Sequence, residues 1–185
     1  WNADVWSSRF DFDAGSWGAA VRVSLAAENQ WANPVVAADR FGNAHAVWVA
    51  NDGGSEGDVW AARFFADAGS WGPPSSIPVA VKADFWASLA LAIGRDGAAI
   101  LGWRLAGNGS VVFSRFLEPS MAWDTPRVVW NDGMREVALV VVPSGDAVAL
   151  WGSNGARAAR FSVATSTWSV PETVAANEGC REVTA

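Results

Sequence analysis

The sequence predicts an all-β fold, because a unit of about 50 residues recurs along the chain and each copy reads as short strands. An Arg-Phe pair occurs in four copies, and a Trp follows each Arg at a spacing of eight residues. The Arg residues of these pairs are Arg9, Arg63, Arg115 and Arg160. A Gly that precedes a Trp by six residues marks the stretch between them, at Gly42, Gly97 and Gly145. Four antiparallel strands in such a unit are typical of a β-propeller blade.

The second copy defines the four expected strands, which we call A to D. They cover residues 34–39, 44–49, 58–65 and 71–79. Strand C alternates, with Trp60, Ala62 and Phe64 on one face and Arg63 on the other, which indicates a half-buried strand. A β-sandwich or a β-solenoid with internal duplication is the alternative to a propeller.

Two apolar runs, at residues 88–93 and 137–142, are nearly continuous. Such runs suit strands that are buried on both faces, and we expect them to be the inner A strands of their units. Turn residues separate the strands, as in the Asp-Gly turn at residues 96–97.

The order of markers predicts one half blade and three whole blades. The half blade covers residues 1–30, and the blades cover about 31–82, 83–133 and 134–179, with a further strand starting at 180–185. Because an open propeller would expose sheet edges, we expect the ring to be closed by the remainder of a longer chain or by a homodimer. A self-contained four-bladed ring is a third option.

The turn between strands C and D carries a recognisable motif. Residues 13–17 and 67–71 both read DAGSW, whereas residues 119–123 (PSMAW) and 164–168 (ATSTW) lose the Asp and Gly. The unit resembles the bacterial propeller repeats of the Asp-box (BNR) and kelch type, one residue shorter between Gly and Trp than the Asp-box. This resemblance implies a fold and not an activity.

Composition excludes several classes of protein. The chain is 51% apolar and only 17% charged, which argues against disorder. Its net charge of −6 argues against nucleic acid as a partner, and no apolar run approaches the roughly 18 residues of a membrane span. The single Cys180 and single His45 cannot form an internal disulfide or a zinc cluster. The excess of Arg over Lys suggests a bacterial origin, and we expect a binding propeller of this kind to lie outside the cytoplasm.

Differences in repeat length point to a binding face. They fall in the B–C and D–A connections, which share one face of a blade, and binding faces of repeat proteins collect such insertions. Acidic and amide side chains beside aromatic rings suit a glycan, because sugar C–H faces stack and hydroxyls need bidentate partners. The candidate ligand-binding residues are Trp31, Trp86, Asn51, Asp52, Glu56, Asp58, Asn29 and Asp132. Ordinary solvated turns and core Trp residues are the plain alternative.

No residue is assigned a catalytic role. We expect a non-catalytic propeller that binds a glycan or protein; a structural segment of a larger surface protein and a glycoside hydrolase are the alternatives. Retaining sialidases use a Tyr nucleophile, and this chain has no Tyr. No cofactor is expected, although the spacing of Asp11, Asp13 and Gly15 could help to hold a structural Ca²⁺. We expect His45 to be structural and each repeated Arg to stack on the Trp eight residues later.

Overall fold

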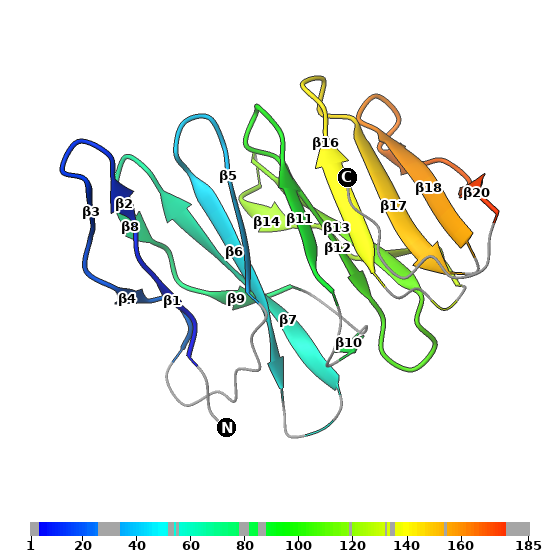
Figure 1. Cartoon of the computed structure of the whole chain (residues 1–185), viewed down its shortest axis with the longest axis horizontal. Coiled ribbons are helices and arrows are strands. Elements are labelled where there is room, and N and C mark those ends of the chain that lie inside the picture. Colours follow the sequence, from blue (N-terminus) through cyan, green and yellow to red (C-terminus); the bar gives the residue numbers. More distant parts are fainter. Residues whose placement is uncertain are drawn as a thin grey trace.

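The computed structural model describes residues 4–25, 34–51, 54, 56–77, 82–84, 88–118, 120–131, 133, 136–153 and 155–176. Within these residues the chain is all β, without a helix, and its strands pair in antiparallel fashion. Four groups of strands, which we call sheets I to IV, follow one another along the chain and fan out side by side (Figure 1).

The strands of each sheet follow in chain order. Sheet I holds β1 (Trp6–Ser7), β2 (Phe10–Asp11), β3 (Ser16–Trp17) and β4 (Val21–Arg22), in two small pairs. Sheet II holds β5 (Val35–Ala38), β6 (Ala44–Asn51), β7 (Glu56–Phe65), β8 (Ser70–Trp71), β9 (Ser75–Ser76) and β10 (Ala83–Asp84). Sheet III holds β11 (Ala90–Ile93), β12 (Ala99–Arg104), β13 (Val111–Leu117), β14 (Ala122–Trp123) and β15 (Arg127–Trp130). Sheet IV holds β16 (Val137–Val141), β17 (Ala147–Ser153), β18 (Gly155–Ser162), β19 (Thr167–Trp168) and β20 (Glu172–Ala175).

The outermost strand of each sheet is broken into short pieces, where the sequence predicts one continuous D strand. In sheet II, β8, β9 and β10 all pair with β7. Proline supplies no backbone N–H for a ladder, and prolines stand between the pieces at Pro73, Pro74, Pro126 and Pro171. The first expected C strand is also broken, into β1 and β2.

The A and B strands lie where the sequence predicts them, but the prediction of burial on both faces is wrong for β16. Val137 is buried, but Val140 is 42% exposed. Val36 on β5 is likewise 68% exposed. Each lies on a sheet face that no described A or B strand covers, since sheet IV follows the other sheets and sheet I has only the C and D positions. β11, which contacts both β5 and β16, is better covered.

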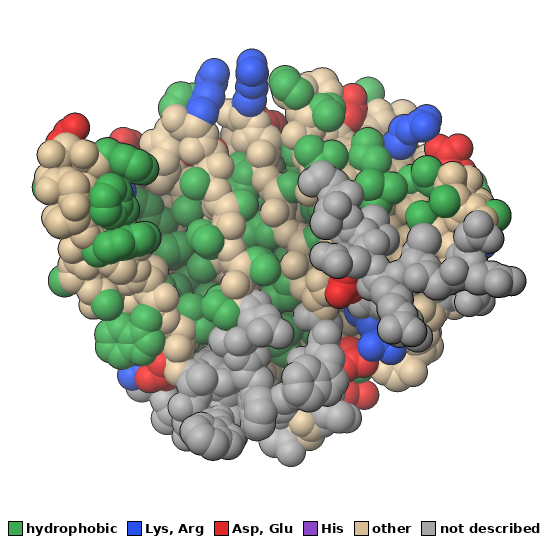
Figure 2. Space-filling model, viewed as in Figure 1, with side chains coloured by type: hydrophobic (Ala, Val, Ile, Leu, Met, Phe, Trp, Pro, Cys, Tyr) green, Lys and Arg blue, Asp and Glu red, His purple; other side chains and the backbone are tan. Residues whose placement is uncertain are grey.

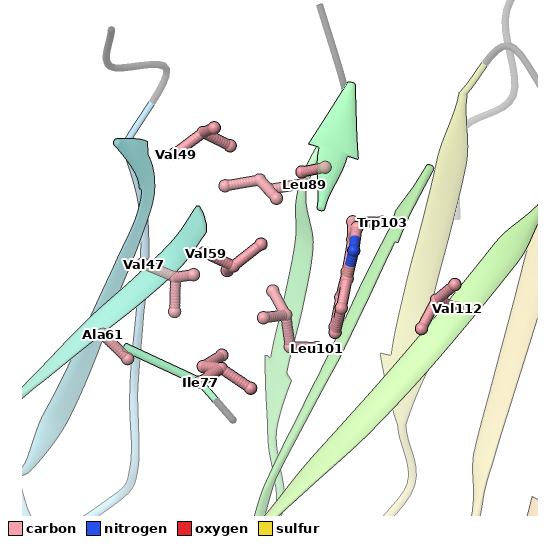
Figure 3. Packing of buried hydrophobic residues seen from close by; sticks show 10 residues of the cluster. Val47, Val49, Val59, Ala61, Ile77, Leu89, Leu101, Trp103 and Val112 are labelled. Atoms are coloured by element: carbon pink, nitrogen blue, oxygen red, sulfur yellow. The ribbon is translucent and has the colours of Figure 1, made fainter. Parts of the chain in front are cut away.

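The hydrophobic core consists of three clusters, each between two consecutive sheets. A fully buried Trp at the same place on strand B belongs to each cluster: Trp48, Trp103 and Trp151. Figure 3 shows the cluster between sheets II and III, where Val47 and Val59 of sheet II face Leu101 and Trp103 of sheet III. The sheets are therefore held together by burial of their faces, as in stacked β-sheets generally.

The C–D turns keep one backbone conformation although their sequences differ. The sixth residue after each repeated Arg has a positive φ: 64° at Gly15, 63° at Gly69, 50° at Met121 and 53° at Ser166. Glycine adopts this left-handed conformation without steric cost, whereas a residue with a Cβ is strained. The turns of sheets III and IV thus keep the geometry of the DAGSW turns without their glycine.

We expect Trp103→Ala to lower the free energy of unfolding by about 3–5 kcal/mol, because it leaves a cavity between sheets II and III. Phe41→Ala is the control, since Phe41 is 60% exposed on a turn, and it should cost no more than about 1 kcal/mol. Urea unfolding followed by tryptophan fluorescence measures both values. Equal losses in the two variants would show that the inter-sheet cluster does not hold the sheets together.

We expect Ser166→Gly to raise the free energy of unfolding by about 1 kcal/mol, because it relieves the left-handed strain at this turn. The reverse change at the equivalent position, Gly69→Ser, should lower it by a similar amount, since a Cβ there meets no atom within 4 Å and only the backbone is strained. Thermal unfolding of the two variants tests the pair; a loss of stability in Ser166→Gly would contradict the turn equivalence.

Candidate functional site

Three of the four repeated Arg residues lie over the Phe of the following sheet. The guanidinium carbon is 5.6 Å from the ring centre for Arg9 and Phe64, 5.2 Å for Arg63 and Phe116, and 4.5 Å for Arg115 and Phe161. This is cation–π distance. One short sequence pair therefore makes the same contact at all three junctions between sheets.

The predicted stacking of each Arg on the Trp eight residues later is wrong. The antiparallel register places the Phe, and not the Arg, opposite that Trp, as in Phe116 opposite Trp123. The two rings of this pair meet edge to face, 5.7 Å apart. The Arg points to the other face of its strand because side chains alternate, and this face is covered by the next sheet.

The guanidinium of Arg63 has several partners at the junction between sheets II and III. Its Nη2 atom lies 2.6 Å from Oε1 of Glu118, and its Nη1 atom lies 3.2 Å from the sulfur of Met121. The guanidinium also lies 5.2 Å from the ring of Phe65 in its own sheet. Only 12% of the Arg63 side chain is exposed, so this Arg is part of the structure between sheets II and III.

Hollows open beside these contacts, toward the outer strands. The hollow between sheets II and III has a volume of about 330 Å³ and includes Arg63, Phe116 and Trp123 in its walls. The hollow between sheets III and IV is larger, about 740 Å³, and Arg115, Phe161 and Trp168 occupy the matching places in it. We call this larger hollow the III–IV groove.

The III–IV groove combines aromatic rings with polar groups near solvent. Trp130 and Trp168 are half-buried in its walls, and Arg127 is exposed at its edge. Thr167 and Ser169 add hydroxyl groups on the sheet IV side. Unlike Arg63, Arg127 makes no ion pair within the described structure. A planar guanidinium beside indole rings can bind the hydroxyls of a ligand whose apolar face stacks on the rings.

Contacts within the structure fix two of the groups that line the groove. Asp124 accepts the backbone N–H of Arg115 at 2.7 Å and the hydroxyl of Ser114 at 3.2 Å. Trp168 of sheet IV stacks on Phe113 of sheet III with ring centres 4.2 Å apart, so this ring pair joins the two walls. These contacts hold the walls of the groove in place, and preorganised walls lower the entropic cost of binding.

His45 is buried in the smaller hollow, where its ring lies 4.4 Å from that of Phe116. Desolvation by burial and, to a smaller extent, the positive charge of Arg63 together lower the pKa of His45 to about 4, against the opposing effect of Asp39. A neutral imidazole between aromatic rings fits the structural role expected from the sequence.

The structure describes only part of the loop face that the sequence selects. Trp31, Trp86, Asp52, Asn29 and Asp132 lie outside the described residues. Asn51 ends β6, and Glu56 and Asp58 lie at the start of β7, so these three meet at the end of one hairpin. Their side of sheet II reaches sheet III through an ion pair between Asp84 and Arg104, 3.0 Å apart.

The turn with the proposed calcium spacing is closed by its own carboxylate. Oδ1 of Asp11 accepts the backbone N–H groups of Asp13 at 2.9 Å and Ala14 at 3.0 Å. In the part of the chain that the structure describes, no three or more His, Cys, Asp or Glu residues gather as metal ligands. The same part contains no helix of the length and hydropathy needed to cross a membrane.

The residues of the III–IV groove were not among the sequence-predicted site residues. Trp168 and Arg115 are repeat markers, for which the sequence predicts a core position and stacking on Trp123 respectively, and Arg127 carries no marker. The groove forms between two repeats, so its walls are brought together by packing of one sheet on the next, which a single sequence does not display.

No family model and no curated protein matches this sequence. Solved structures are similar in fold. A protein of unknown function from Dyadobacter fermentans has a TM-score of 0.58 at 15% identity, over 88% of this chain and 56% of its own. AofleA from Arthrobotrys oligospora has a TM-score of 0.58 at 10% identity, over 95% of this chain and 51% of its own.

The Hadza microbial sialidase Hz136 is also similar, with a TM-score of 0.51 at 11% identity, over 73% of this chain and 36% of its own. At these identities the likeness concerns the all-β fold alone. The chain spans between 36% and 56% of the length of these three proteins.

We expect His45 to make unfolding depend on pH between about 4 and 6.5. The unfolded state binds a proton at pH 6.5 but the folded state binds it only near pH 4, so this contribution is complete above pH 6.5 and is lost as the pH falls toward 4. Its size is about 3 kcal/mol. Urea unfolding at pH 7 and pH 4.5 should show a smaller difference for His45→Phe than for the wild type; equal differences would contradict the burial of a neutral His45.

Proposed function

We propose that the chain is a segment of a β-propeller that binds a glycan without catalysis, and that the III–IV groove is its binding site. The observation that carries this proposal is the groove itself, which is lined by Trp130, Trp168 and the exposed Arg127. Indole faces and a bidentate cation match the two kinds of surface that a sugar ring offers.

Three findings support a propeller. Sheets II to IV each have four strands when the broken outer strand is counted as one. The sheets follow one another in chain order, and β11 contacts the innermost strands of both neighbouring sheets. The similarity to a sialidase and to AofleA is consistent with such a fold. Binding sites in propellers lie on surfaces that the repeats build together.

Catalysis by this segment is not part of the proposal. A sialidase of the Tyr-nucleophile type cannot take that nucleophile from these 185 residues, since they contain no Tyr. Among the described residues, the carboxylates nearest the groove are engaged, as in Asp124, which holds the backbone of β13. Glu56, by contrast, lies on the loop face of sheet II and marks the alternative binding site that the sequence selects.

We expect the wild-type chain to bind at least one sugar on a glycan array, and Arg127→Ala to weaken binding of that sugar at least tenfold in calorimetric titration. The loss reflects removal of hydrogen bonds from a charged donor, about 1.4 kcal/mol or more. Arg95→Ala removes an exposed Arg on a turn of sheet III, away from the groove, and should bind as the wild type does.

The same titration with Glu56→Gln separates the two candidate sites. Unchanged binding in Glu56→Gln together with a loss in Arg127→Ala supports the groove. The opposite pattern would move the site to the loop face, and an array without any bound sugar would refute glycan binding by this segment.

A further inference from the structure

Sheets IV and I, at the two ends of the row, each carry one half of the Arg-over-Phe contact that joins neighbouring sheets. Neither half has its partner among the described residues. Three of the four repeated Arg residues lie over a Phe of the next sheet. Arg160 of sheet IV makes no such contact in the described structure, and 72% of its side chain is exposed, against 12% for Arg63. Its recorded partner is Glu172 on the same sheet, at 2.9 Å.

At the other end, sheet I presents the aromatic half. Phe10 and Trp17 form the same edge-to-face pair as in the other sheets, with ring centres 5.4 Å apart. In sheets II to IV the Trp of this pair is half-buried, whereas Trp17 is 69% exposed. Figure 2 shows hydrophobic side chains gathered at the left end of the view, where Figure 1 places sheet I.

Sheet IV also has the hollow into which such a pair fits. A hollow of about 360 Å³ on this sheet is lined by Val148 and Arg160 among others. Val148 stands three residues after the Gly of its A–B turn, as His45 does in sheet II. In sheet II that place is occupied, since His45 lies 4.4 Å from the ring of Phe116 and 5.6 Å from that of Trp123, both from sheet III. On sheet IV no described residue takes the place of Phe116 and Trp123.

Exposed apolar side chains surround both unpaired halves. On sheet I they are Trp6 and Phe12, and on sheet IV they are Val140, Val142, Val163 and Val174. Exposed apolar patches of this kind mark interaction surfaces. The two surfaces are complementary, because sheet I presents aromatic rings and sheet IV presents a cation above a hollow.

We propose that sheet IV of one chain binds sheet I of a second copy, with Phe10 and Trp17 of the second copy seated over Val148 and beneath Arg160. The contact repeats the junctions between sheets I and II, II and III, and III and IV. It is head-to-tail, because the two surfaces differ, so each copy keeps one surface free for a further copy or for closure of a ring. This interface does not depend on what the III–IV groove binds.

The test is the mass of the full chain in solution, measured by light scattering after gel filtration at several concentrations. We expect a species of at least twice 19.5 kDa for the wild type. Arg160→Glu and Trp17→Asp, one at each end, should each weaken association at least tenfold. Arg95→Glu makes the same charge change on an exposed turn of sheet III and should leave the mass unchanged. Circular dichroism and thermal unfolding check that each variant is folded.

Mixing the two variants tests the head-to-tail arrangement. Trp17→Asp retains an intact Arg160 end and Arg160→Glu retains an intact Trp17 end, so one sound junction forms between them. The mixture should therefore associate more tightly than either variant alone. A wild-type mass of 19.5 kDa at every concentration, equal effects of Arg160→Glu and Arg95→Glu, or no recovery on mixing would each overturn the proposal.

Discussion

Burial of one sheet face against the next is the interaction on which the rest of this structure depends. Among the described residues, each cluster of buried hydrophobic side chains takes members from two sheets, and no sheet has a core of its own. The strand-B indoles of Trp48, Trp103 and Trp151 fill the middle of these clusters, and the Arg-over-Phe contacts close them on the outer side. Stability in such an array is a sum over junctions between neighbours.

The sequence predicts the strands well because their signal is local. Alternation along residues 58–64 and the Gly of each A–B turn place strands A to C within about two residues of the observed ones. It predicts the outer strand poorly, since Pro126 and Pro171 interrupt pairing that the apolar pattern alone suggests. The sequence also predicts the wrong partner for each Arg. The Arg and Phe side chains point to opposite faces of the strand, and the partner of the Arg lies in the next repeat, about 50 residues later.

The candidate groove follows from the same arrangement. Neighbouring sheets meet closely around the strand-B Trp and diverge toward their outer strands, so a hollow opens beside the Arg contact at successive junctions. The repeat builds the walls, while residues outside the markers, such as Arg127, make one groove chemically different from another. Under the proposed function, specificity depends on the outer strand of each unit, which is its least regular strand.

The broken outer strands have a consequence for how the protein behaves in a crowded solution. A long, straight edge offers a row of free N–H and C=O groups to any extended chain that passes, and this is the usual start of edge-to-edge aggregation. Here the outer strand of each sheet is divided into pieces of two to four residues. Pro126 and Pro171 lie between such pieces and supply no backbone N–H donor. Two such molecules cannot form a continuous β-ladder along their outer strands. Recognition of a partner at these strands therefore depends on side chains and not on backbone pairing.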